Sequence, residues 1–370
     1  MSLKSLLILL VEYVLLQVYN VPMIAGRDVL LISTLHDPRG VFLNAVPQVG
    51  SVVLESYRGW VVNVTTTTDR GVKEALRTLA LAGVVVTEPD TDKPIVADKI
   101  ENDHVNLLSN SIGVAEKLGV GKIQYTDGDR IATAAMHYPD DLRRMAQRAS
   151  ELLREGESYI NFRRSVEDYF THHPPLVQTE FECNRIYSEV FGMPLDLGST
   201  GAGMSLGTLR EIVQKSPQLE PVSFPEPKWL LIAKEMGVSI KSEETQNVLT
   251  FETPDQFPTK EKNSPYEKIQ QEYMATYGVA STVSPNEWNL RFNTERQYLT
   301  LLRNHLASFG LDGIKREQIV GKIERSLVSA EGRHAAINEA LALSPEETHL
   351  VVQGRAENVL AQQPSHRERS

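Results

Sequence analysis

Between residues 28 and 164, short apolar runs alternate with longer segments of helical periodicity, and this alternation limits the fold most strongly. The runs are rich in valine and isoleucine and are bounded by Gly or Asp, which is typical of buried strands in a parallel sheet. The segments between them have the length of crossover helices. The expected strands are 28–34, 59–67, 83–88, 121–126 and 158–164, and the expected helices are 41–56, 71–82, 103–119 and 139–156. We therefore predict an α/β fold with a mainly parallel twisted sheet flanked by helices.

The second half of the sequence has a different pattern. Helices are expected at 176–192, at 226–237 and over most of the chain after residue 264, and a strand at 238–242. The glycine-rich stretch 198–203 is expected to be either a flexible turn before a helix or a phosphate cradle at its N-terminus. The predicted organisation is an apolar segment 1–27, an α/β domain 28–255, a helical extension 256–361 and a disordered tail 362–370.

Composition limits the partners and the compartment. The chain has 370 residues and a formal net charge of −10, which argues against nucleic acid as a partner. The single cysteine, Cys183, excludes an intramolecular disulfide and fits a reducing cytoplasm. Residues 5–24 are strongly apolar, but Glu12 interrupts them, which weakens the reading as a membrane span. A buried helix and peripheral membrane contact through residues 5–24 both remain open.

Polar side chains follow several of the expected strands, at 34–40, 65–70, 87–92 and 126–130. In a doubly wound sheet, ligands bind outside the carboxyl ends of the strands. Asp127 and Asp129 stand one residue apart directly after the fourth strand, with Gly128 relaxing the backbone between them. Such a pair is either a solvated acidic turn or part of a site for Mg²⁺ or Mn²⁺, which prefer hard oxygen ligands.

Several common site motifs are missing from the sequence. There is no GxGxxG after the first strand and no GxxxxGKS/T, which argues against a dinucleotide site and a P-loop. A GxSxG elbow is also absent, and Cys183 lies in a segment with a core-like pattern, so nucleophilic catalysis by Ser or Cys has no support.

The order of these parts resembles the nucleotide-sugar glycosyltransferases of GT-A fold, the family 2-like group in particular. The first strand ends in 35-LHDPRG-40, and 125-YTDGDR-130 is similar to the family's DxD stretch. The segment 199–212 is similar to the glycine-rich acceptor segment, and 224–240 is similar to the family's acidic residue, helix, Gly and strand. The resemblance covers residues 28–255 and implies transfer of a sugar from a nucleoside diphosphate sugar to an unidentified hydroxyl acceptor.

The resemblance also implies roles for particular residues. Asp127 and Asp129 would hold Mn²⁺ or Mg²⁺, with Asp129 the more direct ligand, and the cation would stabilise the leaving diphosphate. Glu226 would be the base that deprotonates the acceptor, and a single base opposite the leaving group implies inversion. The implied nucleotide-sugar-binding residues are Thr34, His36, Asp37, Asp69 and Asp127.

Two further hypotheses compete with this one. A GT-A-like binding protein without catalytic activity is suggested by Thr65–Thr68, which replace the family's acidic pair, and by the absence of Arg in 103–111. A nucleotidyltransferase ranks last, because 37-DPRG-40 is a poor match to its phosphate loop. For Glu226, an ordinary acidic helix N-terminus followed by Pro227 is the alternative to a catalytic base.

Overall fold

The structure is a computed structural model that describes residues 28–37, 40, 42–89, 99–153, 158–169, 171–172, 174–250 and 285–340. The predictions for the apolar segment 1–27 and for the tail 362–370 lie outside the described residues. The chain divides into two compact units. The first comprises the described parts of Met1–Asp168 and Gly198–Pro258, and the second those of Tyr169–Leu197 and Thr259–Ser370.

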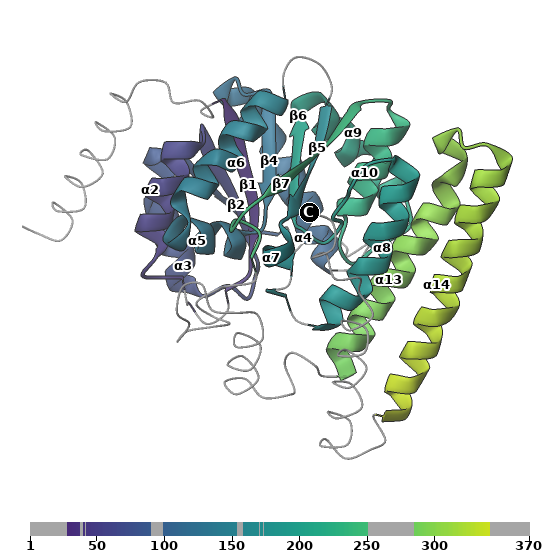
Figure 1. Ribbon diagram of the computed structural model, residues 1–370. Coiled ribbons are helices and arrows are strands. Elements are labelled where there is room, and N and C mark those ends of the chain that lie inside the picture. The colour runs from purple at the N-terminus through teal and green to yellow at the C-terminus, as the bar shows by residue number, and fades with distance from the viewer. Residues whose placement is uncertain are drawn as a thin grey trace, which may run out of the picture. The chain divides into compact units, whose positions relative to one another are not determined.

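The first unit contains a seven-stranded sheet in the order β3-β2-β1-β4-β6-β5-β7 (Figure 1). Strand β6 pairs antiparallel with β4 and β5, and the other neighbouring strands pair parallel. The predicted α/β class with a mainly parallel sheet is therefore confirmed. The strands are β1 Val29–Leu35, β2 Gly59–Val64, β3 Val84–Thr87, β4 Lys122–Thr126, β5 Ser158–Arg164, β6 Gly201–Ser205 and β7 Ser239–Thr245.

Helices cover both faces of this sheet (Figure 1). Because side chains alternate along a strand, Val29 and Leu31 of β1 join a core with one helix layer, while Leu30 and Ile32 are buried on the opposite face. The first layer consists of α2 Val46–Ser56, α3 Arg70–Thr78, α5 Gly128–His137 and α6 Pro139–Leu152. The second consists of α4 Lys99–Leu118, α9 Leu206–Lys215 and α10 Glu226–Glu235. Short helical elements are η1 Ala80–Ala82, α7 Val166–Tyr169 and η2 Ser216–Gln218.

The glycine-rich stretch differs from its prediction. Gly198 and Ser199 lie in a turn and bend, as one of the two predictions expected, but Gly201–Ser205 forms β6 in the interior of the sheet. A Cβ atom on Gly201 would lie 2.9 Å from the Cβ of Phe162, and one on Gly203 would lie 3.1 Å from the Cδ1 of Ile160. The glycines are therefore needed because the side chains of β5 pack closely over the β6 backbone.

The described part of the second unit is helical. It joins Tyr169–Leu197, which the prediction placed within the domain 28–255, to the described part of the predicted extension 256–361. Its described elements are α8 Pro174–Phe191, α13 Pro285–His305, η3 Leu306–Phe309 and α14 Gly313–Ala340. Within the described ranges of the whole chain, no helix combines the length and the apolar character that crossing a membrane would require.

In the first unit, a buried carboxylate holds the turn that follows β7. Asp168 is 2% exposed, and its two oxygens lie 3.0 and 2.9 Å from the backbone nitrogen of Asn247. Asn247 has a φ of 59°, a left-handed conformation that Asn tolerates better than most residues. Burial raises the pKa of Asp168 to about 6, although hydrogen bonds from Ser165 and Asn247 oppose the shift.

We expect Asp168 to make the free energy of unfolding depend on pH. Its carboxyl group has an ordinary pKa of 3.8, so the unfolded chain loses this proton first and the native state binds more protons up to a pH of about 6. The contribution of Asp168 to stability therefore falls as the pH rises through this window. Denaturant unfolding at several pH values measures this. As the pH is raised from about 4 to about 7, the free energy of unfolding should fall less in Asp168→Asn than in the wild type. A stability difference that does not change with pH would contradict the shift.

Candidate functional site

The candidate site lies at the carboxyl ends of β1 and β4, where the strand order of the sheet reverses. Parallel pairing aligns Ile32 with Tyr125, and the same register brings Thr34 beside Asp127. The hydroxyl of Thr34 donates to Asp127 Oδ1 at 2.8 Å, and the hydroxyl of Tyr125 donates to the same oxygen at 2.5 Å. Hydroxyl groups on two neighbouring strands, β1 and β4, therefore hold the Asp127 carboxylate in one orientation.

Tyr125 connects Asp127 to helix α4. Its hydroxyl oxygen lies 2.6 Å from Nε2 of His104, and its ring packs edge-on against Trp229 with a centroid distance of 5.1 Å. Burial raises the pKa of Tyr125 well above the ordinary value, and the charges of Asp127 and Glu226 raise it further. The phenol therefore keeps its proton as the donor to Asp127, so its oxygen accepts from His104 Nε2–H. The sequence analysis missed His104 and Tyr125, although Tyr125 shares a strand face with position 127.

Gly128 and Asp129 begin helix α5, where the sequence analysis expected a turn. Gly128 does not have a positive φ, so the predicted need for backbone freedom is wrong. A Cβ atom at this position would lie 2.8 Å from the carbonyl oxygen of Thr34, and close approach to β1 is what requires glycine. Asp129 Oδ1 accepts from the backbone nitrogen of Arg130 at 2.8 Å. Burial raises the pKa of Asp129, the charge of Arg130 opposes this, and the charge of Asp127 adds to it.

A divalent cation at these two carboxylates would have to take most of its coordination from water or a ligand, and their role as metal ligands stays a prediction. Among the described residues, no group of three or more His, Cys, Asp or Glu side chains is placed to hold a metal by itself. Mg²⁺ is typically bound by one or two carboxylates together with water and substrate phosphates, and Asp127 and Asp129 would supply that set. A bound cation would offset the negative charges of Asp127 and Asp129, which lie close to one another.

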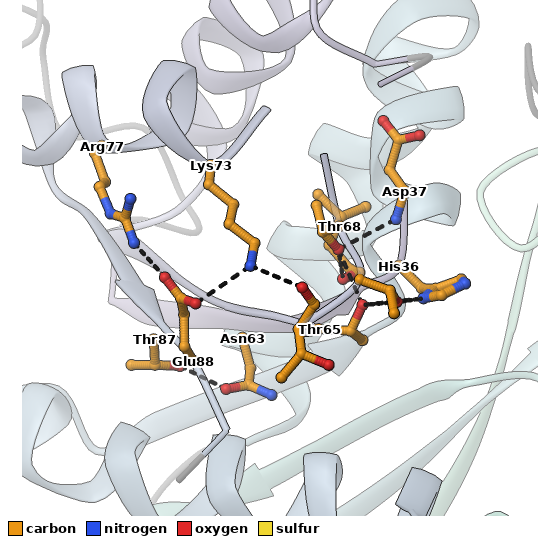
Figure 2. Close-up of polar contacts among 12 residues, drawn as sticks. His36, Asp37, Asn63, Thr65, Thr68, Lys73, Arg77, Thr87 and Glu88 are labelled. Atoms are coloured by element: carbon orange, nitrogen blue, oxygen red, sulfur yellow. Dashed lines mark hydrogen bonds and ion pairs between the residues drawn. The ribbon is translucent and has the colours of Figure 1, made fainter. Parts of the chain in front are cut away.

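The loops after β1 and β2 form a second polar group (Figure 2). His36 is exposed, and its Nδ1 lies 2.9 Å from the Thr65 hydroxyl. The Thr65 hydroxyl lies 3.0 Å from that of Thr68, which donates to the carbonyl of Leu35 at 3.0 Å. Hydroxyl groups therefore link the ends of two neighbouring strands at the place where the GT-A resemblance implies acidic residues.

Asp37 and Asp69 hold the backbone of these loops. Asp37 is 3% exposed, and its Oδ2 accepts from the Phe42 nitrogen at 2.9 Å. The Asp37 carbonyl accepts from the Asp69 nitrogen at 2.8 Å, and Asp69 Oδ1 caps α3 by accepting from Gly71 at 2.8 Å and Val72 at 3.3 Å. Both carboxylates thus have a local structural task, and their contact with a nucleotide stays a prediction.

The structure adds polar residues from β2, α3 and the end of β3 (Figure 2). Asn63 is fully buried in β2, donates to the carbonyl of Asp103 at 3.2 Å and accepts from the Thr87 hydroxyl at 3.0 Å. Lys73 donates to the carbonyl of Thr66 at 3.3 Å and to Glu88 at 3.2 Å. An Asn inside an otherwise apolar strand was the one sequence signal for this group.

Glu226 is the first residue of α10 and is 6% exposed. Burial raises the pKa of Tyr125 and of Tyr159, and the negative charge of Glu226 raises both further. The helix N-terminus favours an acidic residue at this position, and Pro227 follows it. An acidic residue at a helix N-terminus accounts for this position, and the role of Glu226 as a base stays a prediction.

Comparison with known proteins gives a limited picture. No protein-family model matches the chain. Cytochrome P450 monooxygenase dtpC of Aspergillus flavus is 28% identical over 92 residues, which are 25% of this chain and 48% of that protein. The chain thus spans about half the length of this curated relative.

Three solved structures resemble this chain over about 70% of its length. Glucosyl-3-phosphoglycerate synthase of Mycobacterium tuberculosis, with Mn²⁺, UDP and phosphoglyceric acid, is 13% identical with a TM-score of 0.40, over 70% of this chain and 79% of that one. The same enzyme with Mn²⁺, UDP-glucose and phosphoglyceric acid is 13% identical with a TM-score of 0.40, over 72% and 80%. A mycobacterial protein is 15% identical with a TM-score of 0.40, over 70% and 75%. At this level the matches record a resemblance and carry no conclusion about activity.

Proposed function

We propose that the chain is a glycosyltransferase that moves a sugar from a nucleoside diphosphate sugar to a hydroxyl acceptor with the help of Mn²⁺ or Mg²⁺. The observation that carries the proposal is the Asp127 carboxylate, which two hydroxyl groups fix at the β1–β4 reversal, one residue from Asp129. Ligands of α/β sheets bind outside the carboxyl ends of strands at such a reversal.

Each part of the site has a task in this reaction. A bound cation supplies a Lewis acid that stabilises the charge developing on the diphosphate leaving group. Asp127 and Asp129 would hold such a cation, and the hydroxyls of Thr34 and Tyr125 keep Asp127 oriented. Glu226 accepts the proton of the attacking hydroxyl, and attack from the face opposite the leaving group inverts the anomeric centre. The loop residues His36, Asp37 and Asp69 border the nucleotide.

One observation favours a second candidate, a binding protein of the same fold that does not catalyse transfer. The hydroxyls of Thr65 and Thr68 are hydrogen-bonded to each other and to the β1 end, where the family resemblance implies acidic side chains for the donor. A donor that binds without being transferred or hydrolysed, across a range of acceptors, would favour this candidate over the enzyme.

The proposal is tested by thermal unfolding of the full chain with a panel of nucleoside diphosphate sugars, with and without Mn²⁺. We expect a donor to raise the melting temperature only when the cation is present, because the diphosphate would bind through the cation held by Asp127 and Asp129. A ligand at 100 times its Kd stabilises the native state by about 2.7 kcal/mol. Asp129→Asn should remove this metal-dependent rise, and Tyr125→Phe should reduce it. Asp140→Asn, an exposed acid at the start of α6, is the matched control and should retain it.

The absence of a metal-dependent rise with every donor would overturn the glycosyltransferase proposal. An equal loss in Asp129→Asn and Asp140→Asn would show that the effect is one of net charge, and the assignment of the cation to Asp129 would then be wrong.

A further inference from the structure

Within the second unit, α8 and α14 line an open cavity of about 310 Å³, at which Arg325 and Ser329 are exposed to solvent. The side of α14 that lines it carries Lys322, Arg325, Ser326, Ser329 and Arg333, which recur at helical spacing along one face. Paired helices usually bury an apolar stripe. Here the small side chains of Ser326 and Ser329 leave the cavity between the two helices, and long cationic side chains line it.

The charge of the cavity is opposite to that of the whole chain. Its lining contains four cations, Arg185, Lys322, Arg325 and Arg333, and one carboxylate, Glu182. The complete chain has a formal net charge of −10. In such a lining, an anion is attracted by the cation that is not already paired with a carboxylate.

Three of the four cations are held by carboxylates. Arg185 donates to both oxygens of Glu182 at 2.9 and 2.6 Å. Lys322 lies 2.6 Å from each oxygen of Glu189, and Arg333 lies 2.7 and 2.9 Å from those of Glu295. These pairs fix the cationic walls before any ligand arrives, which reduces the entropy lost on binding.

Arg325 is different, because it has no ion-pair partner among the described residues. The four cations of the lining face three carboxylates in these pairs, so one positive charge stays uncompensated in the cavity. Burial would raise the pKa of Glu182, but the Arg185 guanidinium and the Ser326 hydroxyl hold it below the ordinary value. Glu182 therefore stays ionised and bound to Arg185, and Arg325 is the group left to bind an anion.

We propose that this cavity binds a small phosphomonoester, with its phosphate on Arg325 and the Ser329 hydroxyl and its organic part against Phe181. The planar guanidinium matches phosphate oxygens with two parallel hydrogen bonds, and hydroxyl groups complete such sites. Phe181 is 38% exposed and supplies an apolar surface at the lining. The volume is at the lower end of the range of about 300–1,000 Å³ for ligand pockets, which suits a small molecule. This site is independent of the proposed glycosyltransferase function.

Titration calorimetry of the full chain tests the site with inorganic phosphate and phenyl phosphate as probes. EDTA is present so that phosphate does not bind through a cation at Asp127 and Asp129, and ionic strength is held constant. We expect both probes to bind at one site, with phenyl phosphate the tighter. Arg325→Gln should weaken both by about tenfold or more, as expected for loss of a charged hydrogen bond. Arg325→Lys should keep part of the affinity.

Two variants show where binding occurs. Arg316→Gln removes an exposed charge from the same helix away from the cavity and should leave both affinities unchanged. Phe181→Ala should remove the preference for phenyl phosphate and keep the binding of inorganic phosphate. The proposal is overturned if neither probe binds, or if Arg316→Gln and Arg325→Gln weaken binding equally. Tighter binding of inorganic phosphate than of the ester would overturn the phosphomonoester assignment.

Discussion

Replacement of Lys228 by Met is expected to lower the free energy of unfolding by about 3–5 kcal/mol, because it leaves a buried carboxylate without its counter-charge. Lys228 is 1% exposed and Glu101 is 3% exposed, and the two form an ion pair between α10 and α4. Glu101 also accepts from the Val222 nitrogen at 3.2 Å, and Lys228 donates to the Ser216 carbonyl at 3.4 Å. Equilibrium unfolding in denaturant measures the loss.

A double variant separates the buried charge from lost packing. Glu101→Gln together with Lys228→Met leaves no charge buried and keeps an acceptor for Val222, so most of the loss should be recovered. The matched control is Arg210→Met, which breaks an ion pair with Glu116 whose side chains are 52% and 51% exposed. It should cost only about 0–1 kcal/mol, as exposed pairs do. If the double variant is as unstable as Lys228→Met, then lost packing and not the unpaired carboxylate is the cause of the lower stability.

Gly128→Ala is expected to destabilise the protein by about 1–3 kcal/mol, the usual range for overpacking. The new methyl group would lie 2.8 Å from the Thr34 carbonyl oxygen and 3.0 Å from the Leu35 Cβ, so α5 or the end of β1 has to move. Such a shift separates Asp127 from the Thr34 hydroxyl that orients it. Denaturant unfolding reports the stability, and the Mn²⁺-dependent thermal shift reports the site.

The control for this variant is Gly121→Ala. Gly121 directly precedes β4, whereas Gly128 follows the other end of that strand. A Cβ atom on Gly121 has no atom within 4 Å, and its φ is not positive. We expect its stability to stay within about 0.5 kcal/mol of the wild type, as for most surface substitutions. If both alanine variants behave alike, close approach to β1 is not the reason for glycine at position 128.

The local sequence pattern was sufficient to predict the strands in which nearly every residue is buried. The runs at 28–34 and 121–126 correspond to β1, VLLISTL, and β4, KIQYT, and almost every residue of these two strands is buried. Strand β6 could not be found in this way. Its residues 201-GAGMS-205 have low strand propensity, and only pairing with β4 and β5 makes them a strand.

The candidate site was predictable to a similar degree. That Asp127 and Asp129 lie close together follows from their spacing in the sequence. That they follow a strand was predicted from the hydrophobic pattern of residues 121–126. The hydroxyls that hold Asp127 come from residues 34 and 125, and the histidine behind them comes from position 104. No sequence periodicity connects these positions. Asp37 and Asp69 were expected at the nucleotide, and their bonds to loop and helix nitrogens became visible only in three dimensions.

The sequence by itself thus determined the α/β class, most strands and the carboxylate pair, because burial and helix periodicity act over a few neighbouring residues. The tertiary structure decided the rest. It placed a glycine strand inside the sheet, required glycine at position 128 through the Thr34 carbonyl, and joined His104, Tyr125 and Asp127. These features depend on backbone and side-chain contacts between segments far apart in the chain, and such contacts leave no local pattern.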